Sequence, residues 1–373
     1  MKEKFTAAVF TRTPWNEMPR IRHQLANLLA AYNHHVTFFE KAESISSGLP
    51  RRISEFLTVV PLPEVIHHQL RPFRQLGNAA NRFPKKFITG YYLKINPPDV
   101  IINFNYDFGF LKDIFPDVPL ITIINDDFIS QAKSWMKKII AERLAETCSL
   151  SDSVLTVSYP LQRQLLKHNP HTYLLLPWAE KKYSAPPSGS ARNTALYFGY
   201  INHRIDFSVL QKIAEAEIPL CLIGPVQRTA DKSALQKLLY HKNVSLLPPQ
   251  LLPEVDLSTV CCSVMAYDTK VESVNACSIS NRAFNLLSYG IPLLQAAFPE
   301  VVEAPQKVIR CCLTAEDYLE GIEYFRNNFY DSQNEIQIFL SGNYADDRYE
   351  FLNRLFLKLT AKQKPVETIN SGY

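Results

Sequence analysis

A short polar segment is the part of this sequence best suited to bind an anion. Positions 278–285 read Ser-Ile-Ser-Asn-Arg-Ala-Phe-Asn, and the spacing predicts a loop followed by a helix over 281–288. Backbone N–H groups at a helix start attract phosphate, and Arg282 in the predicted first turn adds a fixed positive charge. Asn285, on the same face, could hydrogen-bond a ribose hydroxyl. The alternative is an ordinary capped helix that ends at Gly290.

Carboxylates suited to proton transfer lie earlier in the chain. Asp126 and Asp127 follow Asn125 at the end of the run 120–124, which is apolar but for Thr122 and typical of a strand buried on both faces. A carboxylate at such a strand end can take the proton from a hydroxyl nucleophile. Asp107, which follows the predicted strand ending at Phe104, is a third candidate. The alternative role for one of the two adjacent aspartates is to cap the next helix. The sequence does not decide which of the two is the base.

Short apolar strands alternate with amphipathic helices along most of the chain, which predicts α/β structure with parallel sheets covered on both faces. A segment rich in proline and serine, 180–193, separates two such alternating halves. We therefore predict two doubly wound, Rossmann-like domains with ligands bound in the cleft between them. The predicted layout is a first domain at 1–179, a linker at 180–193, a second domain at 194–341, a helix at 342–361 that packs back on the first domain, and a polar tail at 362–373.

Composition excludes several classes of protein. The chain has 373 residues, is 46% hydrophobic, and contains only 11 glycines. It lacks the Gly-x-Gly-x-x-Gly, Walker A, Gly-x-Ser-x-Gly and His-Glu-x-x-His motifs. A net charge of +4 is too small to indicate nucleic-acid binding. The seven cysteines form no Cys-x-x-Cys pair, and no apolar run is long enough for a signal peptide or a membrane span, so we expect a cytoplasmic protein.

Residues 51–94 form a basic stretch, with eight basic residues against two acidic ones and apolar residues between them. A basic amphipathic segment can lie on an anionic membrane surface, because each basic residue near that surface contributes about 1 kcal/mol. A solvated helix face is an equally good interpretation of the same pattern. Peripheral contact with the inner face of the plasma membrane is therefore one expectation for this stretch.

The second half resembles the donor domain of GT-B glycosyltransferases, which use sugar nucleotides. In a family-4-like branch, the segment before Gly290 commonly reads Pro-x-Lys-x-x-Glu-Tyr-Leu-Ala-x-Gly-x-Pro, which aligns Arg282 with the basic position and Asn285 with the acidic one. The runs 195–201, 222–225 and 264–267 resemble successive strands and loops of that domain. The resemblance implies a UDP- or GDP-linked sugar as co-substrate, with donor contacts from Gly199, Tyr200, Gly224, Tyr267, Ser278, Ser280, Asn281, Arg282 and Asn285.

Two departures from the family pattern bear on mechanism. Family-4 enzymes often carry two acidic residues eight apart, whereas this chain has Cys277 and Asn285 there. The Ser-x-Arg-x-x-amide version is loosely similar to the membrane-associated glucuronosyltransferase of xanthan synthesis. That similarity favours an inverting transfer to a glycan or lipid-linked saccharide, as in bacterial surface polysaccharide synthesis. Arg282 and helix dipoles would neutralise the diphosphate, so no metal and no other cofactor is expected.

The first half is expected to hold the acceptor. Its base would be Asp126, Asp127 or Asp107, and Thr11, Arg12 and Trp15 on the loop after the first strand would line the acceptor side. Two other functions fit the same features: a GT-B nucleotide-sugar epimerase, which needs no acceptor, and a non-catalytic protein that binds a sugar nucleotide or glycan. Incubation with donor alone separates the epimerase from the transferase.

Overall fold

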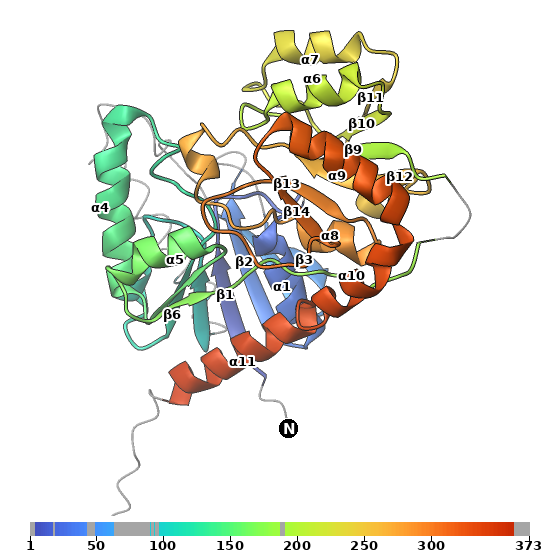
Figure 1. Ribbon diagram of the computed structural model, residues 1–373. Helices are drawn as coiled ribbons and strands as arrows, with labels where there is room; N and C mark the ends of the chain where they lie inside the picture. Colours follow the sequence, from blue (N-terminus) through green and yellow to red (C-terminus); the bar gives the residue numbers. More distant parts are fainter. Residues whose placement is uncertain are drawn as a thin grey trace, which may run out of the picture. The chain divides into compact units, whose positions relative to one another are not determined.

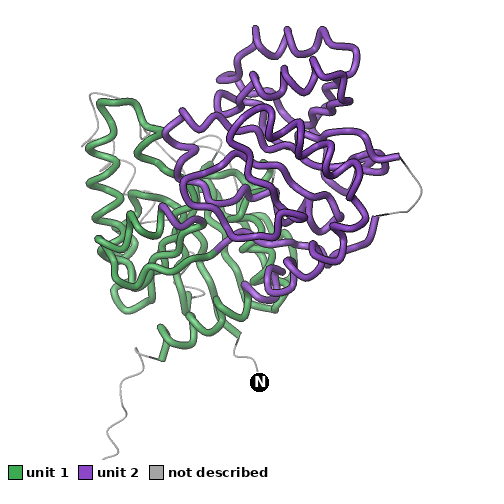
Figure 2. Tube along the Cα trace, viewed as in Figure 1, with its two compact units in different colours: residues 1–157, 161–175, 349–373 green, residues 158–160, 176–348 purple. Residues whose placement is uncertain are grey.

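The computed structural model describes residues 4–361 except residue 18 and residues 43–48, 63–89, 91–92, 94–96 and 187–190. The chain divides into two compact units, shown in different colours in Figure 2. Unit 1 comprises residues 1–157, 161–175 and 349–373, and unit 2 comprises residues 158–160 and 176–348. The division after residue 175 falls four residues before the predicted end of the first domain at 179, and the predicted linker at 180–193 lies within the range of unit 2.

Unit 1 contains an eight-stranded sheet in its described part, with the order β3-β4-β2-β1-β5-β6-β7-β8. Figure 1 labels its strands β1, β2, β3 and β6. All neighbouring strands are parallel except the edge pair β3 and β4. The strands are β1 Thr6–Phe10, β2 His35–Lys41, β3 Arg51–Ser54, β4 Leu57–Leu62, β5 Val100–Asn103, β6 Leu120–Ile124, β7 Ser153–Thr156 and β8 Thr172–Leu174. Its helices are α1 Ile21–Ala31, α3 Leu111–Ile114, α4 Ser134–Leu150 and α5 Tyr159–Leu166, the first two residues of which group with unit 2.

The strand order reverses at β1, which lies between β2 and β5. Every residue of β5, β6 and β7 is buried, as the continuous apolar runs predict for strands with helices or loops on both faces. Because β1, β5 and β6 are neighbours and parallel, their carboxyl ends meet at one edge of the sheet. The point where the strand order reverses is where open α/β sheets bind ligands.

The start of the basic stretch differs from the expectation of an amphipathic surface segment. Residues 51–62 form the β3–β4 hairpin, and β4 pairs in parallel with β2. Val59 and Val60 are therefore buried in the sheet rather than offered to a surface. Arg51 on β3 is bound to Glu40 of β2, with 2.6 Å between guanidinium and carboxylate. Most of the remaining stretch, residues 63–89, 91–92 and 94–96, lies outside the described residues, so the predicted membrane contact stays a prediction.

Unit 2 contains a fully parallel six-stranded sheet in its described part, with the order β11-β10-β9-β12-β13-β14. Numbered within the unit this is the order 3-2-1-4-5-6 of a Rossmann fold, so the predicted doubly wound architecture is confirmed. The strands are β9 Thr194–Phe198, β10 Leu220–Ile223, β11 Val244–Leu247, β12 Val260–Met265, β13 Leu293–Ala296 and β14 Ile309–Cys312. The helices are α6 Phe207–Glu215, α7 Lys232–Leu239, α8 Ala283–Ser288, α9 Ala315–Asn328 and α10 Gln333–Leu340, with 3₁₀ turns at η1 Leu252–Glu254, η2 Glu272–Val274 and η3 Tyr330–Ser332.

Successive residues of β9 point to opposite faces of this sheet and enter two separate cores. Tyr197 packs with residues of α6, α7 and α9, whereas Leu196 packs with residues of α8 and α10. Asp206 and Asp231 begin α6 and α7, since their carboxylates accept backbone N–H groups of the first turn at 2.9 and 3.0 Å. Helices on both faces leave the strand ends as the edge where loops converge.

The long helix near the end of the chain, α11 Ala345–Ala361, contributes its residues from Tyr349 onward to unit 1. The Tyr349 hydroxyl lies 2.9 Å from Nε2 of the buried His34, and Phe356 packs edge-on against Phe5. In the part of the chain that is described, no helix combines the length and apolar composition that crossing a membrane requires.

Candidate functional site

Two glycines at the carboxyl ends of β9 and β10 mark the point in unit 2 where the strand order reverses. Gly199 has φ +135° and Gly224 has φ +144°, a region that residues with a Cβ rarely adopt. A Cβ on Gly199 would lie 1.2 Å from Nη1 of Arg282, and one on Gly224 would lie 2.1 Å from the Gly199 carbonyl oxygen. Glycine at both positions therefore lets two loops and one guanidinium occupy the same small region.

The guanidinium of Arg282 is fixed directly over the end of β9. Nη1 donates to the Phe198 carbonyl, and Nη2 donates to the Tyr267 hydroxyl. Nε lies 3.4 Å from the Ser280 hydroxyl. These bonds use one hydrogen on each terminal nitrogen, so the second hydrogen of each is left for a further acceptor.

Arg282 has no acidic partner in the part of the chain described here. Its contacts are a carbonyl, hydroxyl groups and the Tyr197 ring, whose centroid lies 5.7 Å from the guanidinium carbon. The Tyr197 hydroxyl donates to the Tyr200 carbonyl at 2.8 Å, and burial raises its pKa to about 12, so it is neutral near pH 7. A half-buried cation with only neutral neighbours is suited to hold an anionic ligand.

The segment around Arg282 differs from the predicted helix start. Helix α8 begins at Ala283 and has six residues, and Arg282 precedes it instead of lying in its first turn. So short a helix contributes little dipole, which leaves the side chain of Arg282 as the source of positive charge. Asn281 is exposed beside it.

The other polar side chains predicted for the donor already have protein partners. The Ser278 hydroxyl is buried and accepts from the Tyr159 N–H at 3.1 Å. Asn285 accepts from the Glu180 N–H through its side-chain oxygen at 3.2 Å, which leaves its NH₂ group for a ligand. The structure thus brings Gly199, Gly224, Tyr267, Ser280 and Arg282 together, while Ser278 and Asn285 also hold neighbouring backbone.

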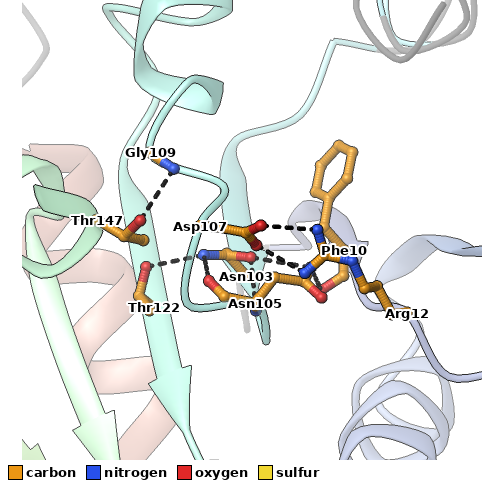
Figure 3. Close-up of polar contacts among 8 residues, drawn as sticks. All are labelled: Phe10, Arg12, Asn103, Asn105, Asp107, Gly109, Thr122 and Thr147. Atoms are coloured by element: carbon orange, nitrogen blue, oxygen red, sulfur yellow. Dashed lines mark hydrogen bonds and ion pairs between the residues drawn. The ribbon is translucent and has the colours of Figure 1, made fainter. Parts of the chain in front are cut away.

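In unit 1, a network of buried amides holds the ends of β1, β5 and β6 together (Figure 3). The Asn103 side chain donates to the Asn105 carbonyl at 2.8 Å and to the Thr122 hydroxyl at 3.2 Å. The Asn105 side chain in turn donates to the Phe10 carbonyl at 3.1 Å. Buried amides bonded in this way fix the path of the backbone, which continues into the loop that carries Asp107. The sequence analysis did not assign Asn103 or Asn105 a role.

Arg12 and Asp107 form a two-pronged ion pair in this loop region (Figure 3). The two terminal nitrogens of Arg12 bind the two oxygens of Asp107 at 2.6 and 2.8 Å, and both side chains are less than a fifth exposed. Arg12 also lies over the Phe108 ring, with 4.8 Å to the centroid. Because each Asp107 oxygen already binds a cation, this carboxylate is the least available of the three candidate bases.

The two adjacent aspartates after β6 have different surroundings. Asp127 closes a turn: one oxygen accepts from the Ile129 and Ser130 N–H groups at 3.1 and 3.0 Å, and the other accepts from the Ser130 hydroxyl. Asp126 accepts from the Gln131 side chain at 2.8 Å. It also lies near enough to Arg22 to act on it electrostatically. Asp127 thus closes a turn and does not cap the next helix, because α4 begins at Ser134 after Lys133 and has no side-chain cap.

The loop after β1 places the three predicted acceptor-side residues in different settings. Thr11 is buried, and Arg12 forms the ion pair above. Trp15 packs edge-on against Phe38, and its backbone N–H donates to the Glu40 carboxylate at 2.6 Å. The loop also meets a residue that the sequence analysis missed, Arg22 in the first turn of α1. A buried arginine inside an apolar helix pattern gives no sequence signal of its own. Among the described residues, no group of three His, Cys, Asp or Glu side chains could hold a metal ion.

Comparison with known proteins agrees with this geometry at the level of fold. No protein-family profile and no curated protein sequence matches the chain. Among solved structures, sucrose-phosphate synthase from Thermosynechococcus elongatus superposes with a TM-score of 0.71 at 13% identity, covering 96% of this chain and 100% of that one. The apo form of the lipopolysaccharide outer core galactosyltransferase WaaB gives 0.65 at 12% identity over 95% and 99% of the two chains.

A third neighbour, WaaG, a glycosyltransferase involved in lipopolysaccharide biosynthesis, gives a TM-score of 0.59 at 14% identity over 95% and 99% of the two chains. These neighbours are GT-B glycosyltransferases, and each is matched over nearly its whole length. The resemblance inferred from the sequence is therefore confirmed for the fold, while the comparison with the xanthan enzyme stays a prediction. Two largely parallel sheets in two units, matched over at least 95% of the chain in these three neighbours, give this chain the GT-B fold of glycosyltransferases.

Proposed function

We propose that this protein transfers a sugar from a nucleotide-sugar donor to the hydroxyl of a glycan or lipid-linked saccharide. The observation that carries the proposal is Arg282, a half-buried guanidinium over Gly199 without a carboxylate partner in the described chain. A diphosphate placed there would accept the remaining hydrogens of its terminal nitrogens. Gly199 and Gly224 would allow the phosphates to approach the backbone.

Asp126 is our candidate for the base in unit 1. It would take the proton of the acceptor hydroxyl as that oxygen bonds to the anomeric carbon of the donor. The bond from that carbon to the diphosphate oxygen breaks, and the nucleoside diphosphate leaves with the electron pair. A single displacement of this kind inverts the anomeric configuration. Arg282 would offset the charge that develops on the leaving diphosphate.

The first test is thermal unfolding with nucleoside diphosphates and their sugars, UDP- and GDP-linked compounds foremost. A ligand at 100 times its dissociation constant stabilises the native state by about 2.7 kcal/mol, which raises the midpoint by several degrees. Arg282→Lys should lose most of this shift, because a lysine cannot keep both bonds and offer a fork. Arg326→Lys is the matched control, since Arg326 is exposed and, among the residues described, forms its ion pair with Glu323 in its own helix.

The proposal is supported if one nucleotide series raises the unfolding midpoint of the wild type and the Arg326 variant but not that of the Arg282 variant. No rise with any nucleotide in the wild type would refute it. An equal rise in all three proteins would remove Arg282 from the donor site.

A further inference from the structure

Arg22 is a buried cation whose surroundings do not balance its charge. It is the second residue of α1, is only 9% exposed, and lies beneath the loop that follows β1. Its guanidinium carbon lies 5.7 Å from the centroid of the Phe104 ring, at the end of the neighbouring strand β5. Within the described residues it forms no ion pair, and the other two arginines of this region do: Arg12 with Asp107 and Arg20 with Glu17.

The donors of Arg22 are used on one side only. Nη1 donates to the Thr13 hydroxyl and to the Thr11 hydroxyl, the latter at 3.2 Å. Nε is buried and has no hydrogen-bond partner in the described chain, and no bond from Nη2 is found there either. Nε and Nη2 form the edge of a guanidinium that binds two oxygens of one anion side by side.

The two threonines add donors of their own. Both hydroxyl oxygens accept from Arg22, so the hydrogen of each hydroxyl is left to donate to another acceptor. Thr11 is 2% and Thr13 5% exposed, so bulk water is not the ready partner. One guanidinium edge and two hydroxyls together offer four hydrogens. A phosphoryl group, with three oxygens, matches that set better than a carboxylate with two.

This arrangement destabilises the folded protein when no anion is bound. Burial lowers the pKa of Arg22 to about 10, with Arg20 adding to the effect and Asp126 and Glu17 opposing it. The side chain is thus still a cation at pH 7, in a place that disfavours charge. A buried polar group left without its full set of partners destabilises a fold and is typical of binding sites.

We propose that Arg22, Thr11 and Thr13 bind a phosphoryl group carried by the acceptor. Arg22 lies at the end of β1, where the strand order of unit 1 reverses, and close to Asp126. A phosphate held there would place a nearby hydroxyl of the same molecule within reach of Asp126. The acceptor class is then a phosphorylated sugar or a lipid-linked sugar phosphate, and this identification rests on the proposed function.

The test measures binding of inorganic phosphate by calorimetry at constant ionic strength, with chloride as the reference anion. Arg22→Met should weaken phosphate binding about tenfold or more, because it removes charge-assisted hydrogen bonds. Arg22→Lys should show an intermediate loss, since charge stays and the fork is lost. Arg20→Met, two residues away in an exposed ion pair, is the matched control and should bind as the wild type does.

Thermal unfolding without phosphate separates a binding role of Arg22 from a structural role, because the two roles predict opposite shifts of the unfolding midpoint in Arg22→Met. Because the charge of Arg22 is unbalanced, Arg22→Met should unfold at the same or a higher temperature than the wild type. A midpoint lowered by several degrees, with phosphate binding unchanged in Arg22→Lys, would overturn the proposal. Phosphate binding that is equal in all four proteins would overturn it as well.

Two further arms identify the source of the phosphate and separate this inference from the donor assignment. A hexose phosphate and farnesyl diphosphate are titrated in turn, and the tighter binder indicates a soluble or a lipid-linked acceptor. If neither compound binds in a way that depends on Arg22, the acceptor role is refuted. Nucleoside diphosphate binding should be the same in the Arg22 variants as in the wild type. If no nucleoside diphosphate binds to the wild type or to any variant while phosphate binding depends on Arg22, the proposed function is refuted and the anion site is retained.

Discussion

Replacing Gly199 with alanine should reach the donor site through Arg282. The new Cβ would lie 1.2 Å from Nη1, and ordinary carbon–nitrogen contact needs roughly 3.5 Å, so the guanidinium must move by about 2 Å. That movement breaks its bonds to Phe198 and Tyr267. The backbone at φ +135° costs a further 1–3 kcal/mol or so of folding free energy.

The expected effect on donor binding follows from the bonds lost. One charge-assisted hydrogen bond contributes about 1.5–3 kcal/mol, so affinity for the nucleoside diphosphate should fall roughly 10- to 100-fold. Gly342→Ala is the matched control, because Gly342 has φ +86° and nothing within 4 Å of an added Cβ. It should lose stability to a similar kind of backbone strain and keep donor affinity.

A double-mutant cycle by calorimetry decides whether the effect passes through Arg282. Once Arg282→Ala has removed the guanidinium, Gly199→Ala should weaken donor binding much less than in the wild type, so most of the effect of the glycine substitution should appear as coupling energy. Additive losses would show that the two residues act separately. Wild-type affinity in Gly199→Ala would refute the geometry on which the donor site is built.

Two other predictions concern the base and the pH dependence of stability. Asp126→Asn should keep donor binding and abolish transfer, whereas Asp127→Asn should lower unfolding stability by about 1 kcal/mol, through the turn that it caps, and retain transfer; full transfer by Asp126→Asn would remove it as the base. Burial lowers the pKa of His23 and of His34 below 6.5, and each Nδ1 accepts a backbone N–H, so both need to be neutral. Their contribution to the free energy of unfolding is therefore complete above pH 6.5 and is lost as the pH falls towards their folded-state pKa values. In chemical unfolding, the free energy of unfolding should fall between pH 7 and pH 5, and it should fall less in His34→Gln than in the wild type. An equal fall in both proteins would exclude His34 as a source of the pH dependence.

The sequence predicted the parts of the fold that depend on local pattern. Strands β5, β6 and β12 are apolar runs with a single polar residue each, and the two Rossmann-like sheets follow from their alternation with helices. Gly199 and Gly224 stood out because the chain has few glycines, and both adopt positive φ. Arg282 was found from its position relative to Gly290, although the helix starts one residue later than the side chain that matters.

What the sequence could not predict depends on contacts between distant residues. Leu57–Leu62 looked like the start of a surface segment, but pairing with β2 makes it an interior strand. Ser278 accepts from Tyr159, 119 positions away, and Arg12 binds Asp107, 95 positions away. Arg22 resembles any polar residue in the first turn of a helix until the fold buries it under Thr11 and Thr13. Only the assembled fold shows which charges are balanced.

The most direct test of the central claim compares the affinity of a nucleoside diphosphate with that of its nucleoside, in the wild type and in Arg282→Met. If Arg282 meets the diphosphate, the wild type should prefer the diphosphate strongly. The variant should lose at least about tenfold of that preference while its nucleoside affinity is unchanged. An identical preference in both proteins would contradict the assignment of Arg282, and with it the donor site proposed for this fold.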